Sequence, residues 1–431
     1  MNKKSSEDKP PTTAQIKNPM GKSDSYWIFF AANAKPTSMR RAVAERLAEE
    51  EAVAIIEQPV SVLRERRVPT LERRFEYIRD SKTCLCYRPL HYPQRFGGFG
   101  KIIKRINEAR LRRELDALLP RKGKRIICYD SPNQNHLVGE LGEDVSVYLA
   151  IDDRTVTVEG DVIPGEIEAE RDLLGKVDKV ICVSKVLADV LRSRMPSGRD
   201  LPIHVLPNGY DERLFDPARK YTEPLILSDI PRPRVLVTGH VSERIDWDGV
   251  AGAVNARPDW TWVFVGPADP EMPKKIAQVS NPMARGGNGE RRPRIVWHDA
   301  IPLKEVPSMI GHCDACAVPY RLNAFTRASN PLKAIEYLAM GRPVLSTRVP
   351  SLERYRNAIE WVDEADGDSY ARALDKLLRQ GQNREIWGSR RLAVTDDSWK
   401  VRSEQFKSIV LDRQNSSRRD LVATGPALPG A

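Results

Sequence analysis

Short apolar runs alternate with amphipathic segments over most of the chain, a pattern typical of strands separated by helices. In the first half, helical patterns cover residues 101–119 and 166–176, and Ser184 is placed to cap a further helix. The apolar runs are YWIFFAANA (26–34), AVAIIEQPV (52–60), KTCLCYRPL (82–90), KRIICYDSP (124–132), VSVYLAIDD (145–153) and the first half of KVDKVICVSKVLADVLRSR (176–194). Because strands that alternate with helices form a parallel sheet covered on both faces, we expect a first doubly wound domain over residues 26–208.

A second alternating series follows residues 209–233, which are rich in proline and charge and are typical of a linker. Its strand-like runs are PRVLVTGHV (233–241), WTWVFVG (260–266), RIVWHDAI (294–301), DACAVPY (314–320), RPVLSTRVP (342–350) and AIEWVDEADG (358–367), with helical patterns at 247–255, 303–311, 331–340 and 366–380. The predicted fold class is therefore α/β, with two doubly wound Rossmann-like domains facing a cleft, the second over residues 234–394. We expect residues 395–411 to form a helix that returns to the first domain, and residues 1–25 and 412–431 to be disordered tails.

Composition and charge narrow the class of protein. The chain has 431 residues, of which 41% are hydrophobic and 30% charged, so it can bury a core and is not wholly disordered. Its 69 basic and 59 acidic residues leave a net charge of +10, which favours anionic partners such as nucleotides, nucleic acid or acidic lipid headgroups. The sequence has no run of about 18 apolar residues and no apolar core of a secretory signal near its start, so we expect a cytoplasmic protein.

The cysteines of the chain are Cys84, Cys86, Cys128, Cys182, Cys313 and Cys316. They are scattered, and several fall in strand-like runs, which predicts reduced and buried thiols rather than a disulfide framework. Cys313 and Cys316 have the CxxC spacing of zinc and redox sites, but no second pair completes a zinc site. Within HCDACAVPY they alternate like strand residues, so we interpret them as core.

The segment SNPLKAIEYLAMGRPVLST (329–347) carries the most informative chemistry. Pro331 suits a first helical turn, and Pro343 ends the helix before a strand. The free N–H groups at a helix start bind phosphate, and Lys333 adds a cation there. Glu336 lies one turn further along, where a carboxylate could accept hydrogen bonds from ribose hydroxyl groups. An amphipathic helix that simply exposes its charged residues explains the same pattern and stays an alternative.

Several segments, taken in order, resemble the GT-B glycosyltransferases, in particular the glycogen-synthase-like, teichuronic-acid and xanthan-type transferases. They are YDSPNQNHLVGELGEDVSVYLAIDD (129–153), ERDLLGKVDKVICVSKVLADVL (170–191), HVLPNGYDERLFDP (204–217), VLVTGHVSERIDWDGV (235–250) and NPLKAIEYLAMGRPVLST (330–347). The resemblance implies a GT-B fold in which the second domain binds a nucleotide sugar and the first binds the acceptor. It also implies UDP as the nucleotide, with no other cofactor and no metal ion.

The resemblance places the donor-binding residues on two segments of the second domain. In the loop GHVSERID (239–246), Gly239 allows the backbone to approach a diphosphate, and Arg244 supplies a cation. On the helix, the donor-binding residues are Ser329, Asn330, Leu332, Lys333 and Glu336. Arg244 and Lys333 would together neutralise the leaving diphosphate in place of a metal ion.

One position departs from the family pattern. Many retaining members carry two glutamates with seven residues between them, and this chain keeps the second, Glu336, but has Ala328 in place of the first. The departure puts a retaining mechanism in doubt. Asp152 and Asp153 end a strand of the first domain, and the resemblance favours Asp153 as the general base that acts on an acceptor hydroxyl. A role in the turn is the alternative for these aspartates.

The glycine-rich segment RPLHYPQRFGGFG (88–100) is a candidate for contacts with the acceptor. His91 and Arg95 are its side chains best suited to line the acceptor cleft, and its glycines make the segment mobile. A plain surface loop explains the segment equally well.

Residues 101–125 hold ten basic and three acidic residues in a helical pattern. Ile102, Ile106, Ala109 and Leu115 form one apolar stripe along it. A basic amphipathic helix of this kind indicates attachment to an anionic membrane surface. A solvated helix face over the core is the alternative.

These observations predict a glycosyltransferase that moves a sugar from a nucleoside-diphosphate sugar to a lipid-linked or polysaccharide acceptor at the cytoplasmic face of the membrane. A nucleotide-sugar epimerase of the same fold is an alternative, although the 6 scattered histidines offer it few cleft acids and bases. A non-enzymatic nucleic-acid-binding protein would fit the charge of +10, but the sequence does not interleave basic residues with stacking aromatic residues. Salt-sensitive binding to DNA would favour the nucleic-acid-binding protein, whereas thermal stabilisation by UDP would favour an enzyme that uses a nucleotide sugar.

Overall fold

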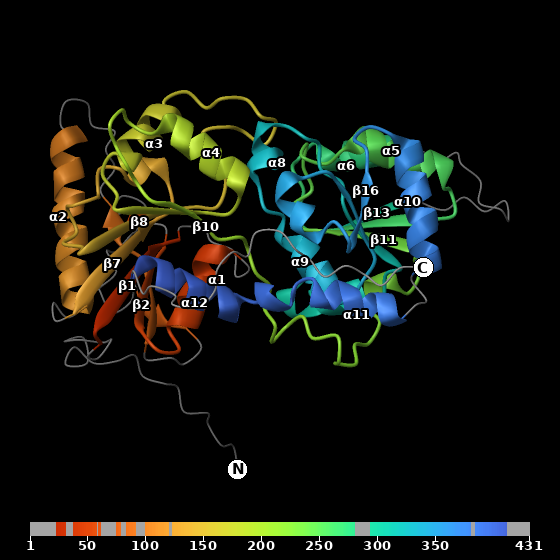
Figure 1. Cartoon of the computed structure of the whole chain (residues 1–431), viewed down its shortest axis with the longest axis horizontal. Coiled ribbons are helices and arrows are strands. Elements are labelled where there is room, and N and C mark those ends of the chain that lie inside the picture. The colour runs from red at the N-terminus through yellow and green to blue at the C-terminus, as the bar shows by residue number, and fades with distance from the viewer. Residues whose placement is uncertain are drawn as a thin grey trace, which may run out of the picture.

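The computed structural model describes residues 23–31, 38–57, 59–61, 75–78, 83–91, 100–119, 123–280, 294–380 and 384–411. Within these ranges the chain folds into two α/β domains that lie side by side, each built on a mainly parallel sheet flanked by helices (Figure 1). The predicted fold class is therefore confirmed. In the described ranges, no helix is both long enough and apolar enough to cross a membrane.

The first domain is organised around an eight-stranded sheet with the order β10-β9-β8-β7-β1-β2-β5-β4. Its strands are β1 (Ser25–Phe30), β2 (Ala52–Ile56), β4 (Phe75–Tyr77), β5 (Cys84–Tyr87), β7 (Lys124–Tyr129), β8 (Val145–Ala150), β9 (Lys179–Cys182) and β10 (Ile203–Val205). Its helices are α1 (Met39–Leu47), α2 (Gly100–Leu118), α3 (Glu166–Leu174) and α4 (Lys185–Arg194), and β3 (Val60–Ser61) pairs with β6 (Leu90–His91) apart from the main sheet. Strands β1 and β8 are buried along their whole length, which explains why their sequences are continuous apolar runs.

The second domain contains a six-stranded parallel sheet with the order β13-β12-β11-β14-β15-β16. Its strands are β11 (Arg234–Thr238), β12 (Thr261–Val265), β13 (Ile295–His298), β14 (Ala315–Val318), β15 (Val344–Thr347) and β16 (Ile359–Val362). Its helices are α5 (Trp247–Ala256), α6 (Met272–Val279), α7 (Val306–Gly311), α8 (Ala324–Ala328), α9 (Leu332–Ala339), α10 (Gly367–Gln380) and α11 (Arg384–Leu392). In Figure 1, α1 of the first domain and α9 of the second face each other across the boundary between the domains.

The last described helix, α12 (Trp399–Val410), packs on the first domain although it follows the second domain in sequence (Figure 1). Phe406 is fully buried there, with its ring centroid 6.0 Å from that of Trp27 and 5.7 Å from that of Phe29. Lys179 Nζ donates hydrogen bonds of 3.0 and 3.1 Å to the carbonyl oxygens of Ile409 and Val410. These contacts fix α12 to the first domain.

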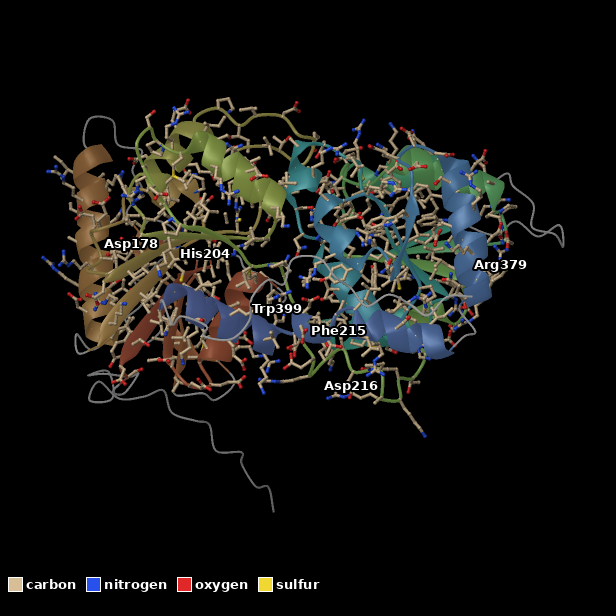
Figure 2. The ribbon with its side chains drawn as sticks, viewed as in Figure 1. Asp178, His204, Phe215, Asp216, Arg379 and Trp399 are labelled. Carbon is tan, nitrogen blue, oxygen red and sulfur yellow. The ribbon has the colours of Figure 1, made fainter. Side chains whose placement is uncertain are left out.

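Two segments of the chain cross between the domains side by side. The backbone N–H of Tyr210 donates to the carbonyl of Asp397 at 3.0 Å, and the N–H of Trp399 donates to the carbonyl of Tyr210 at 2.9 Å. Trp399 belongs to the core of the first domain, whereas Phe215 belongs to the core of the second. Figure 2 shows both side chains near this crossing, which we call the hinge for its place in the chain.

The residues between 209 and 233 are more ordered than a plain linker. They include the short 3-10 helix η5 (Leu225–Leu227), and Leu227 and Ile230 are buried in the core of the second domain. Arg234 Nη2 also donates hydrogen bonds to the carbonyl oxygens of Leu227 and Ile230. After the hinge, the segment therefore packs as part of the second domain.

Some helices differ from the sequence pattern. The short helices α6 and α8, and helix α11, were not among the predicted elements, and α8 has only 5 residues, too few to show a helical period. Helix α2 has two apolar faces rather than the predicted single stripe. Leu115 is fully buried against the sheet, whereas Ile102 is 55% exposed and Ile106 is 50% exposed.

All six cysteines are free and buried, as their positions in the strand-like runs predict. Burial raises the pKa of Cys313 to about 12, so its thiol stays protonated at neutral pH. Cys316 lies within β14 and is fully buried, and burial raises its pKa as well. The CxxC pair is therefore part of the core of the second domain.

Candidate functional site

A cavity of about 490 Å³ opens between the two domains and contains most of the predicted site residues. This volume suits a small-molecule ligand. The first domain lines it with Ser38, Met39, Arg40, Ile151, Asp152, Arg154 and Asn208, and the lining residues of the second domain include Gly239, His240, Arg244, Tyr320, Ser329, Asn330, Leu332, Lys333 and Glu336. We call these two sets the first-domain wall and the second-domain wall. Both lie just beyond the carboxyl ends of parallel strands, where open α/β sheets bind ligands.

The second-domain wall begins where β11 ends. Thr238 is held there because its backbone N–H donates to the hydroxyl of the buried Tyr337 at 2.8 Å. Gly239 follows with a φ of 95°, and a Cβ at this position would lie 3.4 Å from Lys333 Nζ. The bare backbone of Gly239 therefore leaves room beside the ammonium group for a ligand.

On this wall, the charges of Lys333 and Arg244 change the pKa of Tyr320, and Arg244 and Tyr320 change the pKa of Lys333. Lys333 Nζ lies 5.4 Å from the centroid of the Tyr320 ring. Burial acts to raise the pKa of Tyr320, but Lys333 and Arg244 outweigh it and the pKa is lowered. Burial lowers the pKa of Lys333, and the charge of Arg244 lowers it further, while Tyr320 opposes the change. Two half-buried cations that act on the same buried tyrosine favour an anionic ligand.

Glu336 is the carboxylate of the second-domain wall, and only 6% of the residue is exposed. Burial raises its pKa to about 7, although the nearby Lys333 acts in the opposite direction. The carboxyl group therefore changes its charge near neutral pH. It lies one turn into α9, beyond the start of the helix that carries Lys333.

The segment before α9 ties the second-domain wall to the first domain. Asn208 donates two hydrogen bonds to Asn330, from its backbone N–H to Oδ1 at 2.8 Å and from Nδ2 to the carbonyl oxygen at 2.7 Å. Because Oδ1 of Asn330 is engaged, the orientation of its amide is fixed, and its buried Nδ2 has no partner among the described residues. Ser329 Oγ instead donates to the carbonyl of Thr326 at 2.7 Å, so its side chain stabilises the turn.

Ala328 occupies the position where many family members have their first glutamate. It is fully buried and belongs to the core of the first domain, although it lies on α8 of the second. Its carbonyl oxygen accepts a hydrogen bond of 2.6 Å from Ser184 Oγ, the residue that caps α4. Position 328 is therefore a packing contact between the domains.

The two adjacent aspartates of the first domain have different environments. Asp152 lines the cavity, and burial raises its pKa, with Arg154, Arg244 and Arg40 opposing. Asp153 lies outside the cavity lining. Its two carboxylate oxygens each accept a hydrogen bond of 3.0 Å from Arg194, and one also accepts from the backbone N–H and hydroxyl of Thr155.

This geometry corrects the choice of Asp153 as the general base. Burial acts to raise the pKa of Asp153, but the hydrogen bonds from Arg194 and Thr155 outweigh it and the pKa is lowered. A carboxylate with a lowered pKa and both oxygens occupied is a poor proton acceptor. Of the two aspartates, Asp152 is the one placed to act on a ligand in the cavity.

Among the lining residues that sequence reasoning missed are Arg40, Arg154 and His240. Arg40 follows the N-cap of α1, and its Nη1 pairs with Asp130. Arg154 directly follows the two aspartates, a position that signals a place beyond a strand end. His240 follows Gly239, and its Nε2 lies 2.6 Å from Asp269 Oδ1. Nothing in the local sequence distinguishes Arg40 from the other arginines of its helix.

The predicted acceptor-side residues His91 and Arg95 are not among the residues that line the described cavity. The backbone of His91 pairs with Ser61 between β6 and β3. Its side chain, and the whole of Arg95, lie outside the described part of the chain. Their proposed contact with the acceptor stays a prediction.

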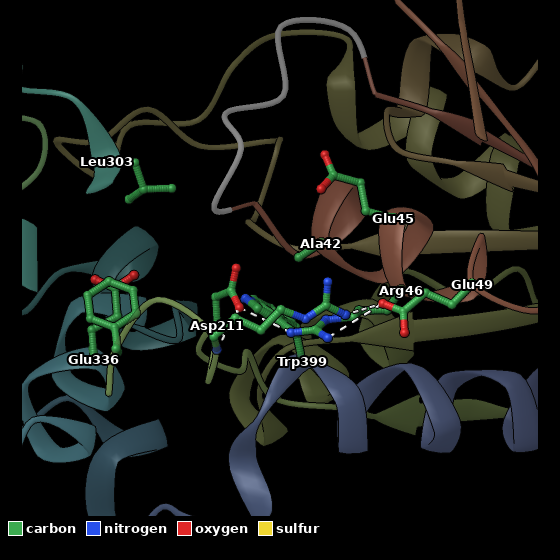
Figure 3. Close-up of a pocket in the computed structure, with 10 residues that line it drawn as sticks. Ala42, Glu45, Arg46, Glu49, Asp211, Leu303, Glu336 and Trp399 are labelled. Atoms are coloured by element: carbon green, nitrogen blue, oxygen red, sulfur yellow. Dashed lines mark hydrogen bonds and ion pairs between the residues drawn. The ribbon is translucent and has the colours of Figure 1, made fainter. Parts of the chain in front are cut away.

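A smaller cavity of about 50 Å³ adjoins the first at the hinge (Figure 3). At its centre Arg46, near the end of α1, pairs with Asp211 at 3.1 Å and with Glu212 at 2.7 Å. Leu303 and Glu336 line both cavities. Helix α1 thus borders the larger cavity at its start and fastens the hinge at its end.

Among the described residues, no group of three or more His, Cys, Asp or Glu side chains is arranged to hold a metal ion. Apart from Asp153, His91 and Arg95, the predicted site residues all line the cavity: Asp152, Gly239, Arg244, Ser329, Asn330, Leu332, Lys333 and Glu336. The charged groups facing the cavity are mostly cations.

The second domain is similar in sequence to known glycosyltransferases. Residues 232–380 match the family described as glycosyl transferases group 1. The protein TuaH of Bacillus subtilis (strain 168), named for glycosyl transfer in teichuronic acid biosynthesis, is 24% identical over 233 residues, which is 54% of this chain. The match spans about half of this relative, 56% of its length.

Solved structures resemble almost the whole chain. The sucrose-phosphate synthase of Thermosynechococcus elongatus aligns with a TM-score of 0.64 and 17% identity, over 92% of this chain and 100% of its own. The trehalose-phosphate synthase of Burkholderia xenovorans, in complex with glucose-6-phosphate, aligns with a TM-score of 0.68 and 11% identity, over 90% of this chain and 100% of its own. The Anabaena protein HepE, in complex with UDP and glucose, aligns with a TM-score of 0.61 and 14% identity, over 90% of this chain and 99% of its own. The chain therefore has the GT-B fold, its second half matches the glycosyl transferases group 1 model, and its resemblance to the GT-B glycosyltransferases is confirmed.

Proposed function

We propose that the protein is a glycosyltransferase that moves a sugar from a nucleoside-diphosphate sugar to a lipid-linked or polysaccharide acceptor. The observation that carries the proposal is the second-domain wall, where Lys333, Arg244 and the bare backbone of Gly239 meet at one cavity between two domains. A diphosphate is the part of a nucleotide sugar that such a cluster of cations would bind. UDP is the proposed nucleotide, in line with the UDP bound to HepE.

The donor would lie along α9. Its diphosphate would meet the backbone N–H groups at the start of the helix, the ammonium of Lys333 and the guanidinium of Arg244. The nucleoside would then extend toward Glu336, whose ionised carboxylate can accept hydrogen bonds from ribose hydroxyl groups. The Nδ2 group of Asn330, which is buried and unpartnered among the described residues, would donate a hydrogen bond to the transferred sugar or the adjacent phosphate.

The chemical step would use the two walls together. The acceptor hydroxyl loses its proton to the carboxylate of Asp152 as its oxygen forms a bond to the anomeric carbon. The bond from that carbon to the phosphate oxygen breaks, and the electron pair leaves with UDP. Lys333 and Arg244 would stabilise the negative charge that develops on the diphosphate, so that these residues do the work that a metal ion does elsewhere. Attack of this kind inverts the anomeric configuration.

The position of Asp152 supports its role as base. Burial raises its pKa, which brings the carboxylate closer to the pKa that suits proton transfer near neutral pH. The charges of Arg154, Arg244 and Arg40 oppose this rise. Ala328, packed between the domains, leaves the position of the first family glutamate without a carboxylate.

A membrane-bound acceptor would be reached by docking of α2 on the lipid surface. Helix α2 lies at the outer end of the first domain (Figure 1), with Ile102 and Ile106 exposed beside the exposed Arg105, Arg112 and Arg113. Two exposed apolar side chains flanked by cations are typical of a helix that binds acidic headgroups.

Binding of the protein to acidic vesicles should fall as the salt concentration rises, and changing the three arginines to glutamate should abolish it without affecting UDP binding. Equal binding to neutral vesicles would contradict this.

A thermal-shift screen tests the proposed function. UDP should raise the melting temperature more than ADP, GDP or CMP, and in a manner that saturates with concentration. Salt-sensitive binding to duplex DNA, without any stabilisation by nucleotides, would favour the nucleic-acid-binding alternative instead. Interconversion of a UDP sugar in the absence of acceptor would favour an epimerase.

A further inference from the structure

The first-domain wall carries hydrogen-bond donors that no described residue satisfies. Ser38 Oγ, Arg40 Nε and Arg154 Nε are all buried and have no hydrogen-bond partner in the described ranges. All three residues line the cavity between the domains, and Arg40 is only 7% exposed. A buried donor without a partner destabilises the protein, and more so where the group is charged. Three such donors on one cavity wall indicate a ligand that supplies the acceptors.

The start of helix α1 adds to this group of donors. Ser38 is the N-cap residue, but its side chain makes no capping hydrogen bond, and the first turn of the helix has no acidic residue. The first backbone N–H groups of a helix have no partner within the helix, and they carry a partial positive charge. In α1 this helix start, with Met39 as its first residue, borders the cavity.

The two arginines of the wall are close enough to affect each other. Burial, and then the charge of Arg154, lowers the pKa of Arg40 to about 10, so Arg40 stays protonated at neutral pH. Asp130 pairs with Nη1 of Arg40, and its other oxygen accepts a hydrogen bond of 2.8 Å from Gln134. Asp152 is near both guanidinium groups. These carboxylates balance the charge of the arginines without a hydrogen bond to either Nε.

We propose that Ser38, Arg40, Arg154 and the start of α1 bind a phosphate group of the acceptor substrate. The inference rests on the proposed function, because it names the chemistry of the acceptor. A phosphate offers oxygens in several directions, which suits a hydroxyl, two guanidinium edges and a helix start, whereas a planar carboxylate could satisfy fewer of them. The acceptor would therefore be a phosphorylated molecule, either a soluble sugar phosphate or a lipid-linked diphosphate sugar.

This phosphate site is separate from the place proposed for the donor diphosphate. Lys333 and Arg244 belong to the second domain, whereas Ser38, Arg40 and Arg154 belong to the first. Asp152 lies on the same wall as the phosphate site, between Ile151 and Arg154 in sequence. An acceptor held by its phosphate would thus present a hydroxyl group to the base and to the donor sugar.

Calorimetric titration of inorganic phosphate into protein saturated with UDP tests the inference. UDP fills the donor site, so any phosphate that still binds must bind elsewhere. We expect binding to the wild type, at least tenfold weaker binding in Arg154→Gln, and several-fold weaker binding in Ser38→Ala. Arg40 is left unchanged because its removal would leave Asp130 buried without its cation. Lys304→Gln, at an exposed lysine of the second domain, is the matched control and should bind phosphate as the wild type does.

Two further titrations distinguish the sources of the phosphate. Glucose 6-phosphate and a short polyprenyl diphosphate in detergent micelles are each added to the UDP-saturated wild type and to Arg154→Gln, with glucose as the neutral control. The true class of acceptor should bind more tightly than inorganic phosphate, and Arg154→Gln should weaken it. Phosphate that binds only in the absence of UDP, or that binds Arg154→Gln unchanged, would overturn the inference. Failure of UDP itself to bind would instead contradict the proposed function.

Discussion

The two walls of the cavity are built in different ways. The second-domain wall is largely one continuous stretch, residues 329–336, joined by the loop after β11. The first-domain wall combines Ser38 and Arg40 with Asp152 and Arg154, which are more than a hundred residues away in sequence. Polar groups of the second-domain wall contact one another, as Lys333 does Tyr320, and Asn330 Nδ2 is its unpartnered buried donor among the described residues, whereas the first-domain wall has three such donors, on Ser38, Arg40 and Arg154. Under the proposed function, this difference would let the second domain bind the donor and the first domain select the acceptor.

The largest effect is expected on the chemical step. Asp152→Asn keeps the size of the side chain and removes the base, so the transfer rate should fall by about 100- to 10,000-fold. UDP affinity, measured by calorimetry, should stay unchanged because the second-domain wall is intact. Asp153→Asn is the control and should keep most of its activity, with a loss of about 1–3 kcal/mol in the free energy of unfolding. Full activity in Asp152→Asn would remove the first-domain wall from the chemistry.

A large effect on stability is expected behind the first-domain wall. Arg194 donates to Asp153 and to Glu170, and both carboxylates are buried. Arg194→Met would leave two buried carboxylates without their cation, and the free energy of unfolding should fall by about 3–5 kcal/mol. Urea denaturation measures this loss. Arg192→Met, at a half-exposed arginine of the same helix, should change stability by less than about 1 kcal/mol. Equal losses in the two variants would show that the buried cluster has no special role.

A moderate effect is expected on donor binding. Lys333→Ala removes the cation beside Gly239 and should weaken UDP binding by about 1–3 kcal/mol, the range of a charge-assisted hydrogen bond. Lys304→Ala, at an exposed lysine of the same domain, should bind UDP like the wild type. If Lys333→Ala and Glu336→Ala both kept full UDP affinity, the donor would not lie along α9.

The smallest effect is expected from Glu336 and depends on pH. Burial raises the pKa of Glu336 from 4.5 to about 7, so its carboxylate becomes fully available to ribose hydroxyl groups only above that pH. UDP affinity should therefore rise as the pH increases through about 7, and Glu336→Gln should flatten the rise.

The same raised pKa affects stability, because between pH 4.5 and about 7 the folded protein holds a proton on Glu336 that the unfolded chain has lost. The contribution of Glu336 to stability should therefore decline as the pH rises from 4.5 to about 7, and then stay constant. If the pH dependence of UDP affinity or of stability persisted in Glu336→Gln, a group other than Glu336 would be responsible for it.

The fold could be predicted largely from the sequence because its strands are buried on both faces. Strands such as β1 and β8 need an apolar side chain at nearly every position, and this produces runs that stand out from the helices around them. Helices whose period is clear, such as α10, could be located for the same reason. The short helix α8 could not, because its ends are set by the capping interactions of Asn323 and Thr326 rather than by an apolar period.

The site was predictable only where it is local in sequence. Residues 329–336 of the second-domain wall follow from one helix start, and the structure places them together at the cavity. The choice between Asp152 and Asp153 depends on which way each side chain points and on Arg194, which is 41 residues away from Asp153. Arg40 enters the site only because β1 and β8 lie near each other in the sheet. Sequence alone does not give such neighbours.

A crystal structure of the wild-type protein with UDP would test the central claim most directly. The account predicts that the diphosphate lies between the backbone of Gly239 and the side chains of Lys333 and Arg244, with the ribose at Glu336. It also predicts that Ser38, Arg40 and Arg154 on the opposite wall stay free of the nucleotide. UDP bound through Arg40 and Arg154, or bound outside the cavity between the domains, would contradict the division of the site into a donor wall and an acceptor wall.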